Sequence, residues 1–338
     1  MYRKTQSLKK YLVIQTASIG DVILSTSIGE KLRINDKECQ IDYLVKKGNE
    51  GVFYGNMEIN EVYIWDKSKE KYKNLLRLIF QIQFNKYDAV FNLQRFFSSG
   101  LITAFSQAKK KYGFKKNPLS FTFSKSFPHE YKENWHEINR NHQLIEHLTD
   151  STPALPKLYP TQKDYAKMSI HKTHPYITIT PASLWFTKQF PFEKWKVMIK
   201  EIAPQIHVYY LGGPADQELC DRLLKESDHQ NSINFAGKLT FVESAALMRD
   251  ALMNFVNDSA AQHIASSVNA HSTSIYCSTV AKFGFGPLSD DSLIIETNEK
   301  LACRPCGLHG HPSCPEGHFK CGTQIDTQSL LNRIQDAS

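Results

Sequence analysis

The sequence predicts an α/β protein made of two parallel-sheet domains that face a central cleft, and three observations support this fold class. Short apolar segments alternate with segments of helical spacing along the chain, and strands separated by helices favour parallel sheets joined by right-handed crossovers. The chain of 338 residues is longer than a typical domain with a single core, so its length suggests two domains. A stretch with three prolines and no periodicity, at 150–160, divides the chain into two similar halves.

The first half begins with an apolar strand at 11–14 (YLVI), a turn at 17–20 and a helix with apolar spacing from Val22. The later segments of this half are equally regular. They predict strands at 41–45, 61–65 and 87–93 and helices at 71–84 and 136–148. We expect an N-terminal domain that spans residues 1–155.

The second half repeats this pattern and predicts a C-terminal domain at 170–324, followed by a terminal helix within 325–338. The expected strands lie at 176–180, 207–211, 233–237, 253–256 and 272–277. The expected helices lie at 192–202, 216–224, 241–250 and 327–335. Because the carboxyl ends of parallel strands line the cleft between such domains, polar residues at strand ends are the candidates for a site.

Composition and charge exclude several classes of protein. With 41% hydrophobic and 22% charged residues, the chain is typical of soluble globular proteins. No apolar run approaches the ~20 residues of a membrane helix. The basic N-terminus lacks a small-residue cleavage site, so we expect a cytoplasmic protein. The net charge of +7 suggests an anionic partner without naming one.

The turn at 17–20 leads into a helix whose first turn contains Asp21. Helix N-termini favour carboxylates, because backbone N–H groups and the helix dipole stabilise negative charge. Capping of the helix is the simpler interpretation of this residue taken alone. A strand, a glycine-containing turn and a helix also present a helix N-terminus to a ligand, so a functional role stays open.

Two strand ends in the second half carry polar groups that suit a diphosphate. Ser183, Thr187 and Lys188 follow the strand at 176–180, and a hydroxyl, helix-start amides and a lysine can together bind phosphate. At 257–263 (NDSAAQH) an N-capping cluster precedes His263, which can donate a proton or a hydrogen bond. The alternatives are a solvated lysine and an ordinary capped helix with a buried histidine.

Arg95 is a ligand candidate in the first half, because it directly follows a strand end. The lysine-rich segments at 67–73 and 109–116 are expected to be solvated. The pair Gly212-Gly213 lacks the spacing of a nicotinamide-binding loop, and the chain contains no P-loop, GxSxG or HExxH motif.

Four of the seven cysteines fall within nineteen residues, at Cys303, Cys306, Cys314 and Cys321. Their first spacing resembles a zinc site, but the second pair is seven residues apart. A structural zinc site, a reduced loop and a partly oxidised loop all stay open, and a catalytic role is the least expected. The other cysteines, at 39, 220 and 277, lie in periodic segments and are expected in the core.

Taken together, these segments resemble the bacterial heptosyltransferases of glycosyltransferase family 9, which build the inner core of lipopolysaccharide. The cysteine loop at 303–321 is also similar to one found in many members. The chain departs from the family at 260–262, where Ala-Ala-Gln replaces Gly-Pro-Met, and at 278–281. The other matching segments are YLVIQTASIGDVILSTSIGEKLR (11–33), ITITPASLWFTKQFPFEKW (177–195), VYYLGGPAD (208–216) and INFAGKLTFVESAALMRDALMNFVNDSAAQHIAS (233–266).

The resemblance implies a GT-B fold with two Rossmann-like domains and an inverting, metal-independent transfer that needs no cofactor. It implies Asp21 as general base, with acceptor-binding residues in the first domain and donor-binding residues in the second. The implied acceptor-binding residues are Ser18, Gly20 and Arg95. The implied donor-binding residues are Ser183, Thr187, Lys188, Asp216, Asp258, Ser259, Ala260 and His263.

The expected partners are an ADP-heptose donor, a lipopolysaccharide core acceptor and, peripherally, the inner membrane surface, with no nucleic acid. Two other classes stay open. A nucleotide-sugar epimerase shares this two-domain architecture but is disfavoured by the family-specific segments. A nucleic-acid-binding protein with a zinc module is disfavoured because the sequence has no dense basic stripe. A glycosyltransferase that uses another nucleotide-sugar is a third possibility.

Overall fold

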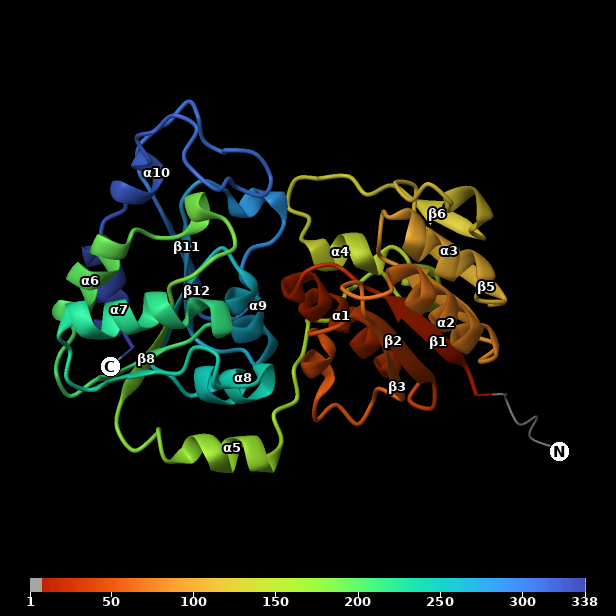
Figure 1. Ribbon diagram of the computed structural model, residues 1–338, viewed down its shortest axis with the longest axis horizontal. Coiled ribbons are helices and arrows are strands. Elements are labelled where there is room, and N and C mark those ends of the chain that lie inside the picture. The colour runs from red at the N-terminus through yellow and green to blue at the C-terminus, as the bar shows by residue number, and fades with distance from the viewer. Residues whose placement is uncertain (1–7, 338) are drawn as a thin grey trace. The chain divides into compact units, whose positions relative to one another are not determined.

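The computed structural model describes residues 8–337 and divides into two compact units, Met1–Tyr159 and Pro160–Ser338, called here the N-terminal and C-terminal units (Figure 1). Each unit contains one six-stranded sheet in which all paired strands are parallel. The strand order is β3-β2-β1-β4-β5-β6 in the first sheet and β12-β11-β10-β7-β8-β9 in the second. Counted within each unit, both sheets have the 3-2-1-4-5-6 order of Rossmann folds. The predicted fold class is confirmed.

The N-terminal unit departs from the sequence prediction at its less regular segments. Helix α3 and strands β5 and β6 were not expected. The helix expected at 136–148 is present but shorter, because α4 ends at His142 and only a 3₁₀ turn, Glu146–Leu148, follows. The elements of this unit are β1 (Lys10–Ile14), α1 (Ile19–Asn35), β2 (Gln40–Lys46), β3 (Glu61–Trp65), α2 (Lys71–Gln83), β4 (Ala89–Asn92), α3 (Phe97–Phe105), β5 (Lys110–Phe114), β6 (Lys125–Phe127) and α4 (Glu137–His142).

The C-terminal unit follows the prediction more closely. Helix α5 in the connecting region and the edge strand β12 were not expected. Its elements are α5 (Gln162–Ser169), β7 (Tyr176–Thr180), α6 (Phe192–Lys200), β8 (His207–Tyr210), α7 (Gln217–Ser227), β9 (Ser232–Asn234), α8 (Phe241–Arg249), β10 (Met253–Asn257), α9 (Ala260–Ser267), β11 (Ser272–Tyr276), β12 (Ser292–Glu296), α10 (Lys320–Thr323) and α11 (Gln328–Gln335).

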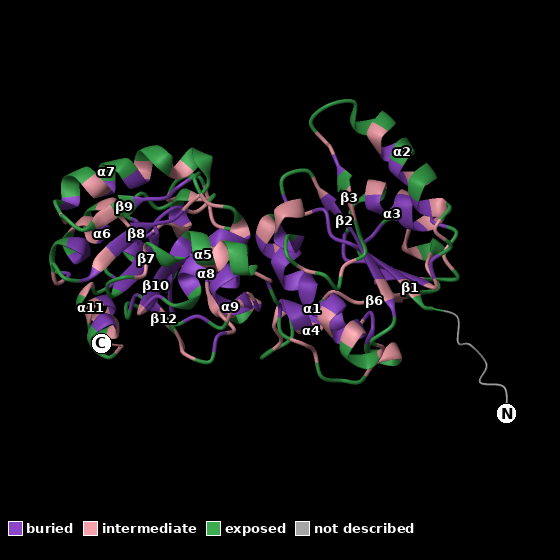
Figure 2. Cartoon of the chain, turned by 90° about the horizontal axis from the view of Figure 1, so that it is seen from below, coloured by how far each residue is buried: buried purple, intermediate pink, exposed green. Residues whose placement is uncertain are grey.

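Burial explains why these segments form sheets and helices. The central strands β1, β7 and β10 are buried except at Lys10, as expected for parallel strands covered by helices (Figure 2), and β7 and β10 bury Thr and Asn side chains among their apolar ones. In the N-terminal core, Leu75, Leu78 and Ile82 of α2 pack against the sheet. In the C-terminal core, α11 contributes Leu330 and Ile334, so the terminal helix belongs to this unit. Among residues 8–337, no helix is long and apolar enough to cross a membrane.

Each sheet reverses its strand order between two central strands, β1 and β4 in the N-terminal unit and β7 and β10 in the C-terminal unit. Ligands of open α/β sheets bind outside the carboxyl ends of the strands at this switch point. Asp21 follows β1 and Arg95 follows β4. Lys188 follows β7 and Asp258 follows β10. Topology therefore places candidate residues of both halves at the two switch points.

Candidate active site

Asp21 and Ser18 form a capping box at the start of α1. The Ser18 hydroxyl accepts a hydrogen bond from the Asp21 backbone N–H at 3.4 Å and donates one to the Asp21 carboxylate. The Ser18 backbone N–H donates to the same carboxylate oxygen at 3.2 Å. Asp21 remains partly exposed, and Gly20 between them is buried. The capping role expected for Asp21 alone is confirmed, and the cap fixes the direction of its carboxylate.

Tyr131 lies in the loop before α4, close enough to several charged side chains for their charges to act on its hydroxyl. Burial raises the pKa of the Tyr131 hydroxyl, and the charges of Arg140, Glu137, Arg95 and Asp21 also act on it. The Arg140 guanidinium lies over the Tyr131 ring at 4.9 Å. Arg95 is exposed beside β4. The structure thus brings Asp21 and Arg95 to one side of the N-terminal unit. The sequence gave no signal for Tyr131, because it lies in an irregular loop.

Arg140 is buried and is held by α4. Its Nε lies 2.6 Å from Glu137 Oε2, and its Nη1 donates to the Trp135 carbonyl at 3.2 Å. His129 Nε2 lies 3.2 Å from the second Glu137 oxygen. A buried arginine with a buried carboxylate fixes the loop that carries Tyr131.

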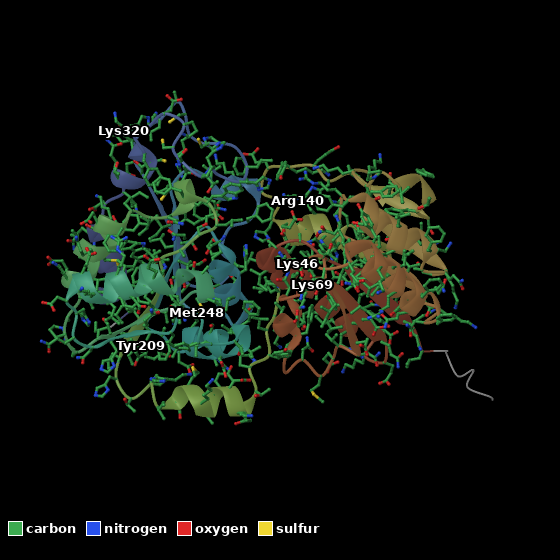
Figure 3. All side chains as sticks on the ribbon, in the orientation of Figure 1. Lys46, Lys69, Arg140, Tyr209, Met248 and Lys320 are labelled. Atoms are coloured by element: carbon green, nitrogen blue, oxygen red, sulfur yellow. The ribbon has the colours of Figure 1, made fainter. Side chains whose placement is uncertain are left out.

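Lys67 is a further candidate that the sequence analysis assigned to a solvated group. Its ammonium donates to the Thr16 carbonyl at 2.9 Å, directly before the Ser18–Asp21 turn. Burial, together with the positive charges of Lys46 and Lys71, lowers its pKa to about 8. Lys46 and Lys69 lie at the same end of the N-terminal sheet (Figure 3). Lys67 follows β3, so its position at a strand end was the signal that could have identified it.

In the C-terminal unit, Lys188 and Asp258 form an ion pair with 2.7 Å between Lys188 Nζ and Asp258 Oδ2. The two side chains are only 15% and 10% exposed. The Thr279 hydroxyl donates to the same Asp258 oxygen at 2.6 Å, and Gln262 Nε2 donates to the other at 3.3 Å. Three donors therefore point at this carboxylate and hold it and the ammonium in one place. The structure therefore joins two predicted donor-side segments.

Asn257 connects the same two segments through the backbone. Its side chain is fully buried, and its amide oxygen accepts from the Phe190 N–H at 2.9 Å. Its amide nitrogen donates to the Pro181 carbonyl at 2.7 Å. Because both partners lie in the loop between β7 and α6, Asn257 fixes the segment that carries Ser183 and Lys188. The sequence analysis included Asn257 only as part of a capping cluster.

Ser259, Ala260 and His263 lie at the start of α9. Ser259 occupies the N-cap position, but its hydroxyl makes no capping hydrogen bond with the described residues. Ala260 is the first helical residue, and His263 is buried one turn later. The first backbone N–H groups of a helix attract anions. Asp258 directly precedes this helix, so the ion pair with Lys188 lies at its N-terminus.

Thr187 binds the cysteine-rich loop. Its hydroxyl accepts from the His311 N–H at 2.8 Å and from the Ser278 hydroxyl at 3.0 Å, and its N–H donates to the His311 carbonyl at 3.1 Å. Gly310 has a φ of +76°, and a Cβ there would lie 2.9 Å from Cγ of Lys188. The loop therefore packs directly against the Lys188 side chain.

Arg304 joins the same loop to the ends of the sheet. Its guanidinium donates to the carbonyls of Cys277 at 2.6 Å and Thr279 at 2.8 Å, and its Nη2 lies 2.6 Å from the Glu296 carboxylate. Since Thr279 donates to Asp258, Arg304 supports the residue that holds the ion pair. Arg304 lies in the motif Cys-Arg-Pro-Cys, where the sequence analysis considered only the cysteines.

All seven cysteines are free thiols, and among residues 8–337 no three His, Cys, Asp or Glu side chains are arranged to hold a metal ion. Cys303 Sγ lies 3.9 Å from His318 Nε2, and Cys314 Sγ accepts from the Phe319 N–H. Burial raises the pKa of Cys321 to about 11. The thiols of this loop thus contact a histidine ring and a backbone N–H group of the same loop.

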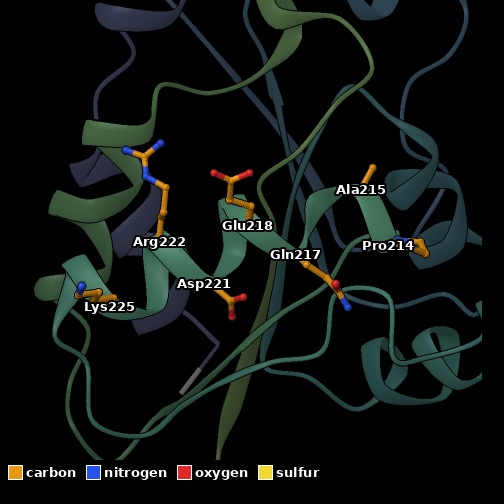
Figure 4. Close-up of a pocket in the computed structure, with 7 residues that line it drawn as sticks. All are labelled: Pro214, Ala215, Gln217, Glu218, Asp221, Arg222 and Lys225. Atoms are coloured by element: carbon orange, nitrogen blue, oxygen red, sulfur yellow. The ribbon is translucent and has the colours of Figure 1, made fainter.

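The hydrogen bonds of Asp216 and Ser183 with their neighbours do not involve the Lys188–Asp258 ion pair. The Asp216 carboxylate accepts from the Gly213 N–H at 2.7 Å within its own turn, and the Ser183 carbonyl accepts from Gln189. A surface hollow of about 540 Å³ beside Asp216 runs along α7 (Figure 4). A second hollow of about 540 Å³ includes Val280 and Arg304, next to the Asp258 network. We take the second as closer to the chemistry, because it is the one that contains part of this network.

A model of a known family matches residues 75–309, which is more than half of the chain. Its description is glycosyltransferase family 9 (heptosyltransferase). The chain belongs to this family. It is therefore a glycosyltransferase of the heptosyltransferase class, as the resemblance implied.

Individual relatives of this family-9 enzyme are distant in sequence and near in fold. Lipopolysaccharide heptosyltransferase 1 of Campylobacter coli is 24% identical over 316 residues, which cover 86% of this chain and 90% of that protein. The solved ADP-heptose heptosyltransferase II of Escherichia coli has a TM-score of 0.79 at 18% identity and covers 97% of this chain and 98% of its own. A family-9 structure from Veillonella parvula has a TM-score of 0.82 at 20% identity and covers 97% of both chains.

Proposed function

We propose that this family-9 enzyme transfers a heptose from ADP-heptose to an inner-core sugar of lipopolysaccharide, with inversion at the anomeric carbon and without a metal ion. The names of its relatives support the substrates, since they include lipopolysaccharide heptosyltransferases and an ADP-heptose enzyme. The observation that carries the donor assignment is the Lys188–Asp258 pair at the N-terminus of α9. A lysine beside free helix-start amides suits a diphosphate.

The donor's diphosphate would bind where Lys188, the first amides of α9 and His263 meet. Negative charge develops on the leaving ADP as its bond to the sugar breaks. The ammonium, the amides and a hydrogen bond from His263 would stabilise that charge, which a metal ion supplies in other transferases. We assign donor binding also to Ser183, Thr187, Asp216, Asp258, Ser259 and Ala260.

The acceptor would bind at the start of α1, with Asp21 as general base. The acceptor hydroxyl forms a bond to the anomeric carbon and gives its proton to the Asp21 carboxylate. The bond from that carbon to the diphosphate oxygen breaks, and its electron pair leaves with ADP. The capping box supports this role because it fixes the direction in which the carboxylate points. Ser18 and Gly20 would shape the acceptor site, and Arg95 would attract anionic core sugars.

The acceptor of such a reaction is anchored in lipid. We therefore infer peripheral contact of the enzyme with the cytoplasmic face of the inner membrane. The excess of basic residues in the N-terminal unit supports this inference, since anionic lipids attract basic surfaces.

The test is incubation of the purified enzyme with ADP-heptose and a core acceptor that lacks its heptose. We expect one heptose of added mass per acceptor and an equal amount of released ADP, unchanged by a metal chelator. NMR of the product should show the anomeric configuration inverted relative to the donor. Conversion of the nucleotide-sugar without acceptor would instead identify an epimerase, and transfer only from another nucleotide-sugar would correct the donor.

A further inference from the structure

Helix α2 and its C-terminal end carry large apolar side chains on the outward side as well as on the inward side. Leu75, Leu78 and Ile82 face the core, as described above. Four large apolar side chains on the other side are exposed to solvent. They are Tyr72 (74% exposed), Leu76 (57%), Phe80 (59%) and Phe84 (76%), called here the α2 stripe. Residues four apart lie on one side of a helix, so the four form a continuous row.

Basic residues surround the α2 stripe. Between positions 71 and 86 the chain carries four Lys or Arg and no acidic residue, and Lys71, Lys73, Arg77 and Lys86 are all exposed. Glu70 at the start of the helix pairs with Lys73 at 3.0 Å. Figure 2 shows the outer side of α2 as mainly exposed. An exposed row of apolar side chains among basic residues fits a partner that has an anionic surface layer and an apolar interior beneath it.

We propose that the α2 stripe is the surface by which the N-terminal unit binds an anionic lipid membrane. Aromatic side chains favour the boundary between lipid headgroups and acyl chains, and exposed Lys and Arg side chains bind anionic headgroups. In a dimer formed through this face, the four exposed Lys and Arg side chains of one copy would face the same four of the other. Charge repulsion therefore opposes self-association through the α2 stripe. This inference rests on the proposed lipid-linked acceptor and identifies the surface that meets its membrane.

The stripe is connected to the candidate site. The segment that precedes α2 contains Lys67, whose ammonium donates to Thr16 in the loop that leads to Asp21. A membrane-bound α2 would therefore keep the start of α1 near the lipid surface. The sugars nearest the lipid anchor are the acceptors of an inner-core transferase, so this arrangement suits the proposed reaction.

The experiment measures binding of the full chain to vesicles of phosphatidylcholine alone and of phosphatidylcholine mixed with phosphatidylglycerol. We expect binding to the anionic vesicles that weakens with salt. The double variant Phe80→Ser/Phe84→Ser should lose about tenfold in affinity, because membrane binding scales with inserted apolar area. Phe121→Ser is the matched control, since Phe121 is an exposed aromatic of the same unit outside α2 and should bind like the wild type.

Three outcomes overturn the proposal: no binding to anionic vesicles, unchanged binding of the double variant, or equal losses in the double variant and the control. A dimer that the double variant dissociates, seen by light scattering, would assign the stripe to self-association instead. Transfer to a lipid-free core oligosaccharide, measured on the same samples, separates this inference from the proposed function. Both variants should keep wild-type turnover there, and absence of turnover in the wild type would count against the function alone.

Discussion

The two units share one strand order but differ in their surfaces. Residues 1–159 contain 25 Lys and Arg against 16 Asp and Glu, and residues 160–338 contain 16 against 18, so their net charges are +9 and −2. Nine exposed Phe and Tyr side chains lie in the N-terminal unit and one lies in the C-terminal unit, counted over residues 8–337. The same topology therefore carries two kinds of surface.

The candidate residues differ in the same way. Asp21 lies in a partly exposed capping box, whereas Asp258 lies in a buried network with Lys188 and Thr279. A buried, prearranged ion pair suits a small nucleotide that always has the same shape. An open basic surface suits a large anionic acceptor. The comparison predicts that substitutions in the N-terminal unit affect the acceptor and the chemistry, and those in the C-terminal unit affect the donor.

The largest effect is expected for Asp21→Asn. The amide cannot accept the acceptor's proton, so kcat should fall by about 10²- to 10⁴-fold, the usual contribution of a general base. Donor affinity, measured by calorimetry with ADP, should stay near the wild-type value because the C-terminal unit is unchanged. Asp164→Asn is the matched control: Asp164 holds the same position in the capping box of α5, so the variant should lose a similar cap and keep wild-type turnover. Near-normal turnover of Asp21→Asn would remove Asp21 from the mechanism.

A smaller loss, of donor affinity, is expected for Lys188→Met. Hydrogen bonds to charged groups contribute about 1.5–3 kcal/mol, so the Kd for ADP should rise about 10- to 100-fold. The acceptor KM should be unchanged. Lys188→Arg keeps the charge and should recover part of the affinity. If the methionine variant binds ADP as the wild type does, the ion pair with Asp258 is structural only.

A pH effect of a few-fold is expected at Lys67. Its pKa is about 8, so it is charged below that pH and neutral above it, and the KM for an anionic acceptor should rise as the pH passes through 8. Lys67→Met should bind the anionic acceptor weakly, and its KM for this acceptor should no longer change as the pH passes through 8. Between pH 8 and the ordinary value near 10.5 the unfolded chain binds more protons at Lys67 than the folded chain. The contribution of Lys67 to folding stability therefore rises with pH in that window. A loss of acceptor affinity above pH 8 would for this reason not be caused by destabilisation of the fold through Lys67. A pH-independent KM in the wild type would contradict an acceptor role for Lys67.

The smallest effect on activity is expected for Arg304→Gln. The variant loses bonds to the backbone carbonyls of Tyr276, Cys277 and Thr279 and to Glu296, so the unfolding free energy should fall by about 1–3 kcal/mol. ADP affinity should fall a few-fold, because Thr279 loses support. Arg222→Gln is a matched control: Arg222 is exposed and its 3.6 Å pair with Glu226 is a surface pair worth about 0–1 kcal/mol. Equal decreases of the melting temperature in the two variants would show that the Arg304 hydrogen bonds contribute no more to stability than a surface ion pair.

Regular apolar spacing made most of the fold predictable from the sequence, and the missed elements lack it. Helix α3 (FSSGLITAF) contains two serines and a glycine, which lower helix propensity. Strand β5 (KKYGF) begins with exposed lysines and was assigned to a charged cluster. The helix expected at 136–148 ends at His142, and Gln143–Ile145 form a turn instead. In each case packing against a neighbouring strand or helix decided the outcome.

The arrangement of the candidate residues was predictable in part. Strand ends selected Asp21 and Arg95 in the N-terminal unit and Lys188 and Asp258 in the C-terminal unit, because parallel topology brings the residues that follow its strands to one edge of each sheet. The residues that hold them could not be found in this way. Asn257, Thr279 and Arg304 act through carbonyls and carboxylates that are far away in sequence, and only the folded chain brings them together.

The close approach of Gly310 to Lys188 has a consequence for enzyme engineering. A single methyl group at position 310 would press on the lysine's methylenes and would lie 3.0 Å from the Thr187 hydroxyl that anchors the loop. The positive φ of Gly310 would strain any other residue there as well. Gly310→Ala would therefore displace the loop and the Lys188 side chain together, which makes a position outside the ion pair a means of weakening nucleotide retention without removing a charged group.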